Sequence, residues 1–338
     1  MAHGKFIYTV SKLRKLLILP LLAAALGLGA WLGWALLTST APAGEQCVLL
    51  RPGWSTRRIA GTLKGAGVIR SADAFLLWHY LHRGHSLKAG EYLFEQPANI
   101  VEVHDRLVRG DIFVHTVVVP EGYTMFDVAQ AVEAAGLGKR EEFLAAAEDA
   151  SLIRDLAPEA KSLEGYLFPD TYDFTRTQSM HEIAAIMVKH FRQVASSLGL
   201  HSDVQDTVIV ASIIEKETAA SEERPLVASV YYNRLEKGMA LDADPSVIYA
   251  EVLAGIYRGS LHHADLQTPS SYNTYQHAGL PPGPIANPGK GSLEAAMHPA
   301  QTDYLYFVSN GDGRHRFAHS LEEHNKNINL YRRAMRAQ

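Results

Sequence analysis

The longest apolar stretch of the chain lies near its N-terminus, where residues 16–37 contain no charged side chain. A helix of this length can cross a bilayer, which takes about 20 residues. Lysine and arginine residues precede the stretch, and the first charge after it is Glu45. The positive-inside rule therefore predicts that residues 1–15 stay in the cytoplasm and that the rest of the chain crosses. A cleaved signal peptide is the alternative, because Ala41-Pro42-Ala43 fits a processing site.

After a small, polar linker at residues 38–45, one pattern occurs twice: a short apolar strand, a glycine turn and an amphipathic helix. Gly53 of the first copy aligns with Gly122 of the second, and a Ser or Thr is placed to cap each helix. The pattern resembles the LysM type of module, which binds N-acetylglucosamine polymers. We therefore expect a LysM-like module at residues 46–150. A small α+β packing domain that binds no ligand is the alternative.

Apolar residues at helical spacing predict long helices at Met180–Leu198 and over Asp203–Thr218. Near the C-terminus, strand Tyr304–Ser309 is expected to return through His315–Phe317 as a hairpin, because Asn, Gly and Asp residues lie between them. This mixture of helices and strands predicts an α+β fold, with a mixed α+β domain at residues 160–338.

Four shorter segments complete the expected fold. Gly90–Phe94 is predicted to be a strand, and Asp244-Pro245 to start a helix, since proline suits the first helical turn. The aromatic segment Leu163–Phe174 is interrupted by proline and is predicted to be an ordered loop. Residues 265–292 are rich in Pro, Gly, Asn, Ser and Tyr, which favours a functional surface over a free linker.

The composition excludes several classes of function. A net charge of −4 shows no bias toward nucleic acid. Cys47 is the one cysteine, so an intrachain disulfide is impossible and no C-x-x-C site exists. The chain has no H-E-x-x-H, no G-x-S-x-G and no P-loop spacing. We therefore expect no metal and no cofactor.

The helix predicted at Asp203–Thr218 ends with two carboxylates, Glu215 and Glu217, whose environments differ from each other. Glu217 shares a helical face with Ile214, Ile213 and Val210, whereas Glu215 does not. Contact with apolar side chains disfavours the charged form of a carboxyl and raises its pKa toward that of a general acid at neutral pH. The alternative is an ordinary carboxylate at a solvated helix end.

Cleavage of a glycosidic bond is one reaction that needs such an acid. A hydrolase of the usual kind also needs a second carboxylate about 5–9.5 Å away. Asp242 and Asp244 are candidates by residue type. If no second carboxylate is close, a hydroxyl of the sugar itself can attack, because a tethered nucleophile has a very high effective molarity.

A series of segments in the second half of the chain carries a family resemblance. They stand in this order: ASIIEKET at 211–218, VASVYYNRL at 227–235, DPSVIY at 244–249, YNTY at 272–275, GLPPGPIANPG at 279–289, HPAQTDYLYFV at 298–308 and HN at 324–325. The series strongly resembles the endolytic murein transglycosylase family, also called the MltG or YceG-like family. EGYLFPDTY at 164–172, the repeat and the N-terminal anchor are similar to the family layout as well.

The resemblance implies cleavage of the β-1,4 bond between N-acetylmuramic acid and N-acetylglucosamine inside nascent glycan strands. The product would end in a 1,6-anhydro-muramoyl sugar, which would terminate strand elongation. The family's catalytic glutamate falls on Glu217, which the helical face also selects. The resemblance further implies substrate contacts for Tyr272, Asn273, Thr274, Tyr275, Pro281 and Pro282, and as second choices, with core or cap roles as the alternative, for Asp244, Asn233 and Tyr249.

The resemblance also implies a place in the cell. It suggests a single-pass protein of the inner membrane, anchored by residues 16–37, with a periplasmic catalytic domain that acts on peptidoglycan glycan strands. Penicillin-binding proteins are the partners it suggests. Two alternatives stay open, namely a hydrolytic muramidase that uses Glu217 and Asp244, and a glycan-binding protein without catalysis.

Overall fold

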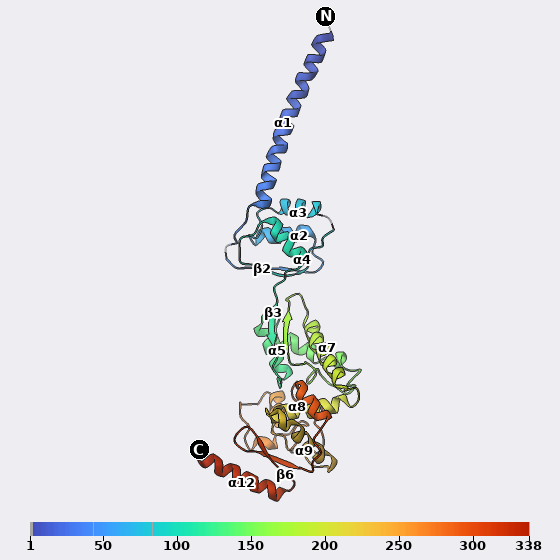
Figure 1. The fold of residues 1–338 in the computed structure, drawn as a ribbon, viewed down its shortest axis with the longest axis vertical. Helices are drawn as coiled ribbons and strands as arrows, with labels where there is room; N and C mark the ends of the chain where they lie inside the picture. Colours follow the sequence, from blue (N-terminus) through green and yellow to red (C-terminus); the bar gives the residue numbers. More distant parts are fainter. Residues whose placement is uncertain (1–2, 43, 83, 338) are drawn as a thin grey trace. The chain divides into compact units, whose positions relative to one another are not determined.

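The computed structural model describes residues 3–42, 44–82 and 84–337, with side chains from residue 19 to residue 336 within these ranges. This part of the chain forms two compact units. The first extends to Val114 and includes Thr175–Thr177, and the second holds His115–Phe174 and the chain from Gln178 onward. Figure 1 shows the elements of both units. The fold is mixed α+β, as the sequence predicts.

The first unit begins with a long helix, α1 (His3–Leu37), whose segment Leu19–Leu37 is long and apolar enough to cross a membrane. The elements that follow are β1 (Gln46–Leu50), α2 (Thr56–Gly65), α3 (Ala72–Leu81), β2 (Gly90–Phe94) and α4 (Ile100–Arg109). The two strands pair antiparallel with Gln46 opposite Phe94. Ala35 and Leu36, from the last turn of α1, are buried in the core that these elements form.

The second unit contains two antiparallel strand pairs and a set of helices. Strand β3 pairs with β4, and β5 pairs with β6. The elements in chain order are β3 (His115–Val118), α5 (Met125–Ala134), α6 (Arg140–Ala147), η1 (Ala150–Leu152), β4 (Thr171–Phe174), α7 (Met180–Leu198), α8 (Val204–Glu217), η2 (Ser221–Glu223), α9 (Arg224–Glu236), α10 (Asp244–Ala254), η3 (Asp265–Gln267), α11 (Lys290–Met297), β5 (Tyr306–Ser309), β6 (His315–Ala318) and α12 (Leu321–Ala337).

Helix α8 runs through the core of the second unit. Every side chain from Thr207 to Ile214 is buried, and α9, α10 and α11 all contact this helix. A helix that is apolar all round is an interior helix rather than a surface one. Helix α8 therefore approaches the surface of the unit only at its two ends. Glu217 is the last residue of the helix.

The two copies of the repeat have the same backbone conformation. Gly53 and Gly122 both have φ of 79°, a left-handed value that favours glycine at the turn between strand and helix. Ser55 caps α2 and Thr124 caps α5, each by accepting a hydrogen bond from a backbone N–H in the first helical turn. The copies belong to different compact units, so a unit boundary falls inside the range 46–150 assigned to one module.

Most elements match their predictions from the sequence. The helix at Met180–Leu198, the strand at Gly90–Phe94 and the C-terminal hairpin are confirmed. One segment differs, because Thr171–Phe174 is strand β4 and not part of a loop. Its partner β3 lies more than 50 residues earlier in the chain, which local patterning does not reveal.

Candidate active site

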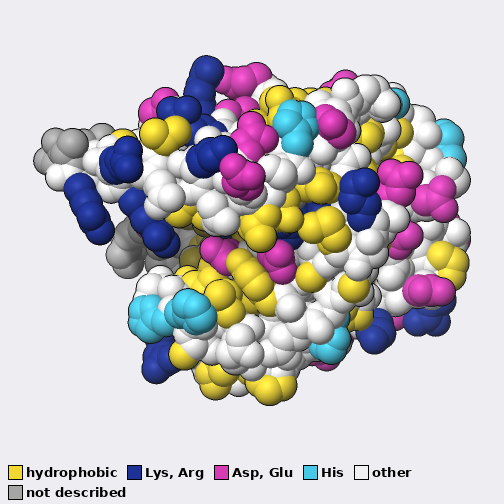
Figure 2. Space-filling view, turned by 90° about the horizontal axis from the view of Figure 1, so that it is seen from below, with side chains coloured by type: hydrophobic (Ala, Val, Ile, Leu, Met, Phe, Trp, Pro, Cys, Tyr) yellow, Lys and Arg dark blue, Asp and Glu magenta, His cyan; other side chains and the backbone are white. Residues whose placement is uncertain are grey.

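The C-terminal end of α8 presents Glu217 beside a pocket. This pocket has a volume of about 510 Å³, within the usual range for a small-molecule or oligosaccharide site. Its lining comes from six parts of the second unit and consists of Glu217, Val230, Tyr231, Arg234, Leu241, Asp242, Asp244, Tyr275, Leu305, Tyr306, Phe307, Val308, Ser309, His315, Leu321 and His324. Figure 2 shows apolar and acidic side chains together in a hollow of the face it presents.

Glu217 holds its proton more tightly than an ordinary glutamic acid. The pKa of its carboxyl is raised to about 7, chiefly by burial; a hydrogen bond from Tyr231 lowers the pKa in part, and the negative charge of Asp244 contributes to raising it. The position of Glu217 at the end of α8 also disfavours a negative charge, because helix C-termini carry partial negative charge. A carboxyl with this pKa can donate a proton at neutral pH and take one back.

Tyr231 on α9 orients the acid. Its hydroxyl donates to Oε1 of Glu217 over 2.8 Å, and its ring is almost fully buried against Phe307 of the hairpin. This hydrogen bond fixes one oxygen of Glu217 and holds the carboxyl at the pocket wall. A side chain already held in one rotamer lowers the entropic cost of reaching the reactive geometry.

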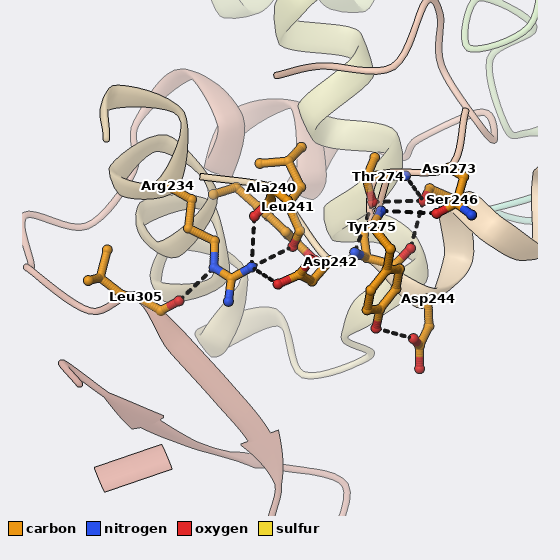
Figure 3. Close-up of polar contacts among 12 residues, drawn as sticks. Arg234, Ala240, Leu241, Asp242, Asp244, Ser246, Asn273, Thr274, Tyr275 and Leu305 are labelled. Atoms are coloured by element: carbon orange, nitrogen blue, oxygen red, sulfur yellow. Dashed lines mark hydrogen bonds and ion pairs between the residues drawn. The ribbon is translucent and has the colours of Figure 1, made fainter. Parts of the chain in front are cut away.

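Arg234, one turn further along α9, ties three segments of the pocket wall together. Its guanidinium donates to the backbone carbonyls of Leu305, Ala240 and Leu241, and pairs with the Asp242 carboxylate at 2.8 Å. Figure 3 shows this arginine between the start of the hairpin and the chain that leads to α10. Asp242 itself has a φ of 52°, a strained value for a residue with a side chain. The arginine thus stabilises the shape of the pocket.

On the opposite side of the pocket, Tyr275 and Asp244 form a second polar pair. The Tyr275 hydroxyl donates to Oδ1 of Asp244 over 2.6 Å, as Figure 3 shows. Both residues line the pocket together with Glu217. The structure therefore brings together four of the residues singled out from the sequence, Glu217, Asp242, Asp244 and Tyr275.

Glu215, the other carboxylate of the helix end, has a different environment. Its side chain is 7% exposed, so it is buried, contrary to a simple surface position. It accepts hydrogen bonds from Arg224 at 3.3 Å and from the backbone N–H of Gly289 at 3.0 Å. Glu215 thus connects the end of α8 to Arg224 and to the residue that precedes α11.

Two residues of the Tyr272–Tyr275 segment are occupied inside the protein. Asn273 is fully buried, where its amide donates to the carbonyls of Leu266 and Thr268 and its oxygen accepts from the N–H of Tyr275. The Thr274 hydroxyl accepts from the backbone N–H of Ala243. These side chains shape the loop that carries Tyr275. Their predicted contact with sugar is not supported by their position, since in the described chain neither lines the pocket.

The remaining expected residues also lie away from this pocket lining. The Asn233 amide donates to the carbonyls of Thr302 and Tyr304, which fixes the approach to the hairpin. Tyr249 is buried, and its hydroxyl donates to Glu164. Tyr272 packs against Tyr249, with ring centroids 5.1 Å apart. Like Tyr272, Pro281 and Pro282 are not among the residues that line the pocket.

The sequence analysis assigned no role in the site to several residues that line the pocket. They include Tyr231 and Arg234 on α9, the hairpin residues, and His324 on α12. Tyr231 and Arg234 lie in the quoted segment VASVYYNRL, and their helical spacing of three places them on one face of α9. That spacing was a usable signal. The His324 ring stacks on Tyr306 of the hairpin with centroids 5.1 Å apart, a contact that no local pattern indicates.

Comparisons with known proteins agree on one family. The model of the YceG-like family matches residues 48–330 of the chain. An endolytic murein transglycosylase of Bacillus subtilis (strain 168) is 34% identical over 295 residues, which cover 81% of this chain and 81% of the relative. An endolytic murein transglycosylase of Streptococcus pneumoniae serotype 2 is 29% identical over 310 residues, which cover 82% of this chain and 56% of the relative.

A solved structure shares the fold. The crystal structure of a yceG-like protein from Listeria monocytogenes aligns with a TM-score of 0.55 and 35% sequence identity. The alignment covers 83% of this chain and 98% of that chain. The similarity therefore extends well beyond the segment around the acid.

Proposed function

The chain belongs to the YceG-like family, and we propose that it is an endolytic murein transglycosylase, which cleaves peptidoglycan glycan strands from within. The bond would be the β-1,4 linkage between N-acetylmuramic acid and N-acetylglucosamine, and the product would carry a 1,6-anhydro-muramoyl end. Cleavage of nascent strands in this way would stop their elongation. The observation that carries the proposal is the partly buried Glu217 with its raised pKa at the wall of the pocket.

In the proposed reaction Glu217 serves first as acid and then as base. Its proton passes to the glycosidic oxygen as the bond from that oxygen to C1 of the muramoyl sugar breaks. The C6 hydroxyl of the same sugar attacks C1, and its proton returns to Glu217. The C6 oxygen is already tethered, so no water is consumed and no second carboxylate has to activate one.

The surroundings of Glu217 support this order of events. Tyr231 holds one carboxyl oxygen, so the other is free to face a sugar in the pocket. The negative charge of Asp244 in the lining favours the positive charge that develops at C1 in an oxocarbenium-like transition state. Tyr275 offers an aromatic ring to a sugar face.

Product mass tests the reaction directly. The full chain is incubated with purified peptidoglycan, and the products of wild type and Glu217→Gln are compared by mass spectrometry. We expect anhydro ends from wild type and none from the variant. Products heavier by one water would instead establish a hydrolytic muramidase using Glu217 and Asp244. Unchanged strands with both proteins would establish a glycan-binding protein without catalysis.

We also propose that α1 crosses the inner membrane once, with residues 1–15 in the cytoplasm and both compact units in the periplasm. The apolar segment Leu19–Leu37 supports this placement. Penicillin-binding proteins that synthesise the same strands are the proposed partners. Protease treatment of right-side-out spheroplasts tests the topology, since a periplasmic body is digested while the N-terminal tail is protected.

Glycan binding by the LysM-like region is a further proposal. The two copies of the repeat share their turn geometry, and Trp54 of the first copy lies partly exposed under the guanidinium of Arg58. An exposed indole can stack on a sugar ring. Titration of the full chain with N-acetylglucosamine oligomers, wild type against Trp54→Ala, tests it. Equal affinity of the two proteins would favour a packing domain without ligand.

A further inference from the structure

Helix α3 of the first unit exposes an apolar face. Leu77, Tyr80 and Leu81 are 39%, 58% and 64% exposed, and their spacing places them on one side of the helix. The opposite side is buried through Phe75. Single exposed apolar residues are common on soluble proteins, but adjacent ones on one helical face indicate a surface that is covered in the functional protein.

The end of α1 lies beside this helix. Ala35 and Leu36 are buried in the core of the first unit, and Leu32 packs against it, whereas Trp34 and Leu37 stay exposed. Helix α1 contacts both α3 and α4. In Figure 1, α3 lies next to the end of α1 and β2 lies on the far side of the same unit. The core of the unit therefore begins before the apolar segment of α1 has ended.

This overlap sets the depth of the unit relative to a bilayer. The apolar segment ends at Leu37, and Leu32 is about 8 Å before that end at about 1.5 Å per residue. The segment has about the length needed to span the hydrocarbon core of a bilayer, about 30 Å. The surface that packs against residues 32–36 must then lie at the boundary between headgroups and acyl chains. Polar side chains are poorly solvated at that depth, and apolar ones are favoured.

A basic residue near the same place has the arrangement expected at the headgroups. The guanidinium of Arg70, which directly precedes the N-cap of α3, lies 4.5 Å from the ring centroid of Trp34. Tryptophan is enriched at the membrane interface, and arginine extends its charge from there toward water and phosphate. Trp34 is on α1 and Arg70 is at the start of α3, so the pair joins the two helices at one level.

We propose that α3 lies in the interface of the bilayer that α1 crosses, with Leu77, Tyr80 and Leu81 inserted at the acyl boundary. The partner of this surface is the lipid bilayer itself. The proposal rests on the single membrane crossing of α1 proposed above. Two contacts with one bilayer limit the tilt of the first unit, because tilting the unit away from the membrane about the end of α1 would lift α3 out of the lipid.

Fluorescent probes in the full chain test this contact. In a Cys47→Ser background, a polarity-sensitive probe is attached at Leu81→Cys and, as the matched control, at Arg51→Cys. Arg51 is exposed and directly follows β1, on the β-sheet side of the unit. The chains are reconstituted in phosphatidylcholine and phosphatidylglycerol vesicles. We expect nitroxide-labelled lipids to quench the probe at 81, and aqueous iodide to quench it several-fold less than the probe at 51.

A third variant separates insertion of the helix from insertion of the probe. Leu77→Asp is combined with Leu81→Cys, and the charge should sharply reduce quenching by nitroxide lipids. Unchanged quenching would mean that the probe entered the bilayer by itself, which overturns the proposal. Equal iodide quenching at 81 and 51, in chains that float with the vesicles, overturns the α3 contact and leaves the anchor intact. Chains that do not float with vesicles overturn both the anchor and the α3 contact.

Discussion

Two glutamic acids of the second unit have raised pKa values for the same main reason and differ in what surrounds them. Burial raises the pKa of Glu217 to about 7 and that of Glu164 to about 8. Glu164 is 2% exposed and accepts from the backbone N–H of Met125, the Tyr249 hydroxyl and the Asn287 amide. Glu217 accepts from Tyr231 and lies in the pocket lining.

The comparison separates a perturbed carboxyl from a useful one. Glu164 joins α5, α10 and the segment at Asn287 in one hydrogen-bond network, and the chain beside it is packed too tightly for a side chain. A Cβ on Gly165 would lie 2.5 Å from Pro284. No substrate can reach an acid in such a place. A raised pKa therefore points to catalysis when it coincides with a pocket, and to internal cross-linking when it does not.

The largest expected difference between the two glutamic acids is in the activity of their variants. Glu217→Gln keeps the shape of the side chain but removes the transferable proton, so we expect kcat to fall by about 10²–10⁴-fold or more. Glu164→Gln should retain most of the activity, because Glu164 is mostly neutral at pH 7. Initial rates on purified peptidoglycan measure both. Similar losses in the two variants would show that Glu217 has no special role.

The next largest expected difference is in the thermal stability of the variants. Glu164→Leu leaves the Met125 N–H and the Tyr249 hydroxyl without an acceptor, at a cost of about 1–3 kcal/mol for each buried donor. We expect a clearly lower midpoint of thermal unfolding. Glu217→Gln, as the matched control, should unfold near the wild-type temperature. A wild-type midpoint for Glu164→Leu would mean that the buried network contributes nothing to the fold.

Stability should also depend on pH through Glu164. Its pKa is about 8 in the folded chain and near the ordinary 4.5 when unfolded, so the folded state binds the proton more tightly. The stabilisation is complete below about pH 4.5 and is lost as pH rises toward 8, by about 1.4 kcal/mol per pH unit. Unfolding of Glu164→Gln between pH 5 and 8 should show a flatter dependence than wild type. Parallel curves would contradict the raised pKa.

The smallest effects sharpen the comparison by moving the pH profile of activity. Glu217 must carry a proton to start the reaction, so activity should fall as pH rises through about 7. Tyr231→Phe removes a hydrogen bond that lowers this pKa and should shift the alkaline limb upward, with a loss in kcat on the order of tenfold. Asp244→Asn removes a charge that raises it and should shift the limb downward. Shifts in one direction for both would refute the assigned contacts.

Much of the fold followed from local patterns. The helix period predicted α7, and the Asp-Pro pair marked the start of α10. Strand β4 was missed, because a strand of four residues depends on a partner far away in the chain. The same limit applies to the pocket wall, where α9 bonds the chain just before β5 through residues about 70 positions apart, and α12 contacts the hairpin.

The structure places Glu217, which the sequence singled out, in the pocket lining. Glu217 could be selected because its environment is set by the helix that carries it. For Asn273 the sequence does not decide between facing a ligand and bonding the backbone of its own loop; in the structure its amide donates to the carbonyls of Leu266 and Thr268. Tyr231 and Arg234 were missed although they stood in a quoted segment, since their role depends on what lies opposite α9.

The order of the pocket parts along the chain has a consequence for synthesis. A ribosome makes Glu217 long before it makes Leu305–Ser309 and α12, which form one wall of the pocket. A nascent or clipped chain that stops after Thr302 carries the acid, the orienting tyrosine and the arginine, but not the wall that encloses them. Cleavage of the chain between Thr302 and Leu305 is therefore expected to open the pocket and abolish activity, although Glu217 itself is retained.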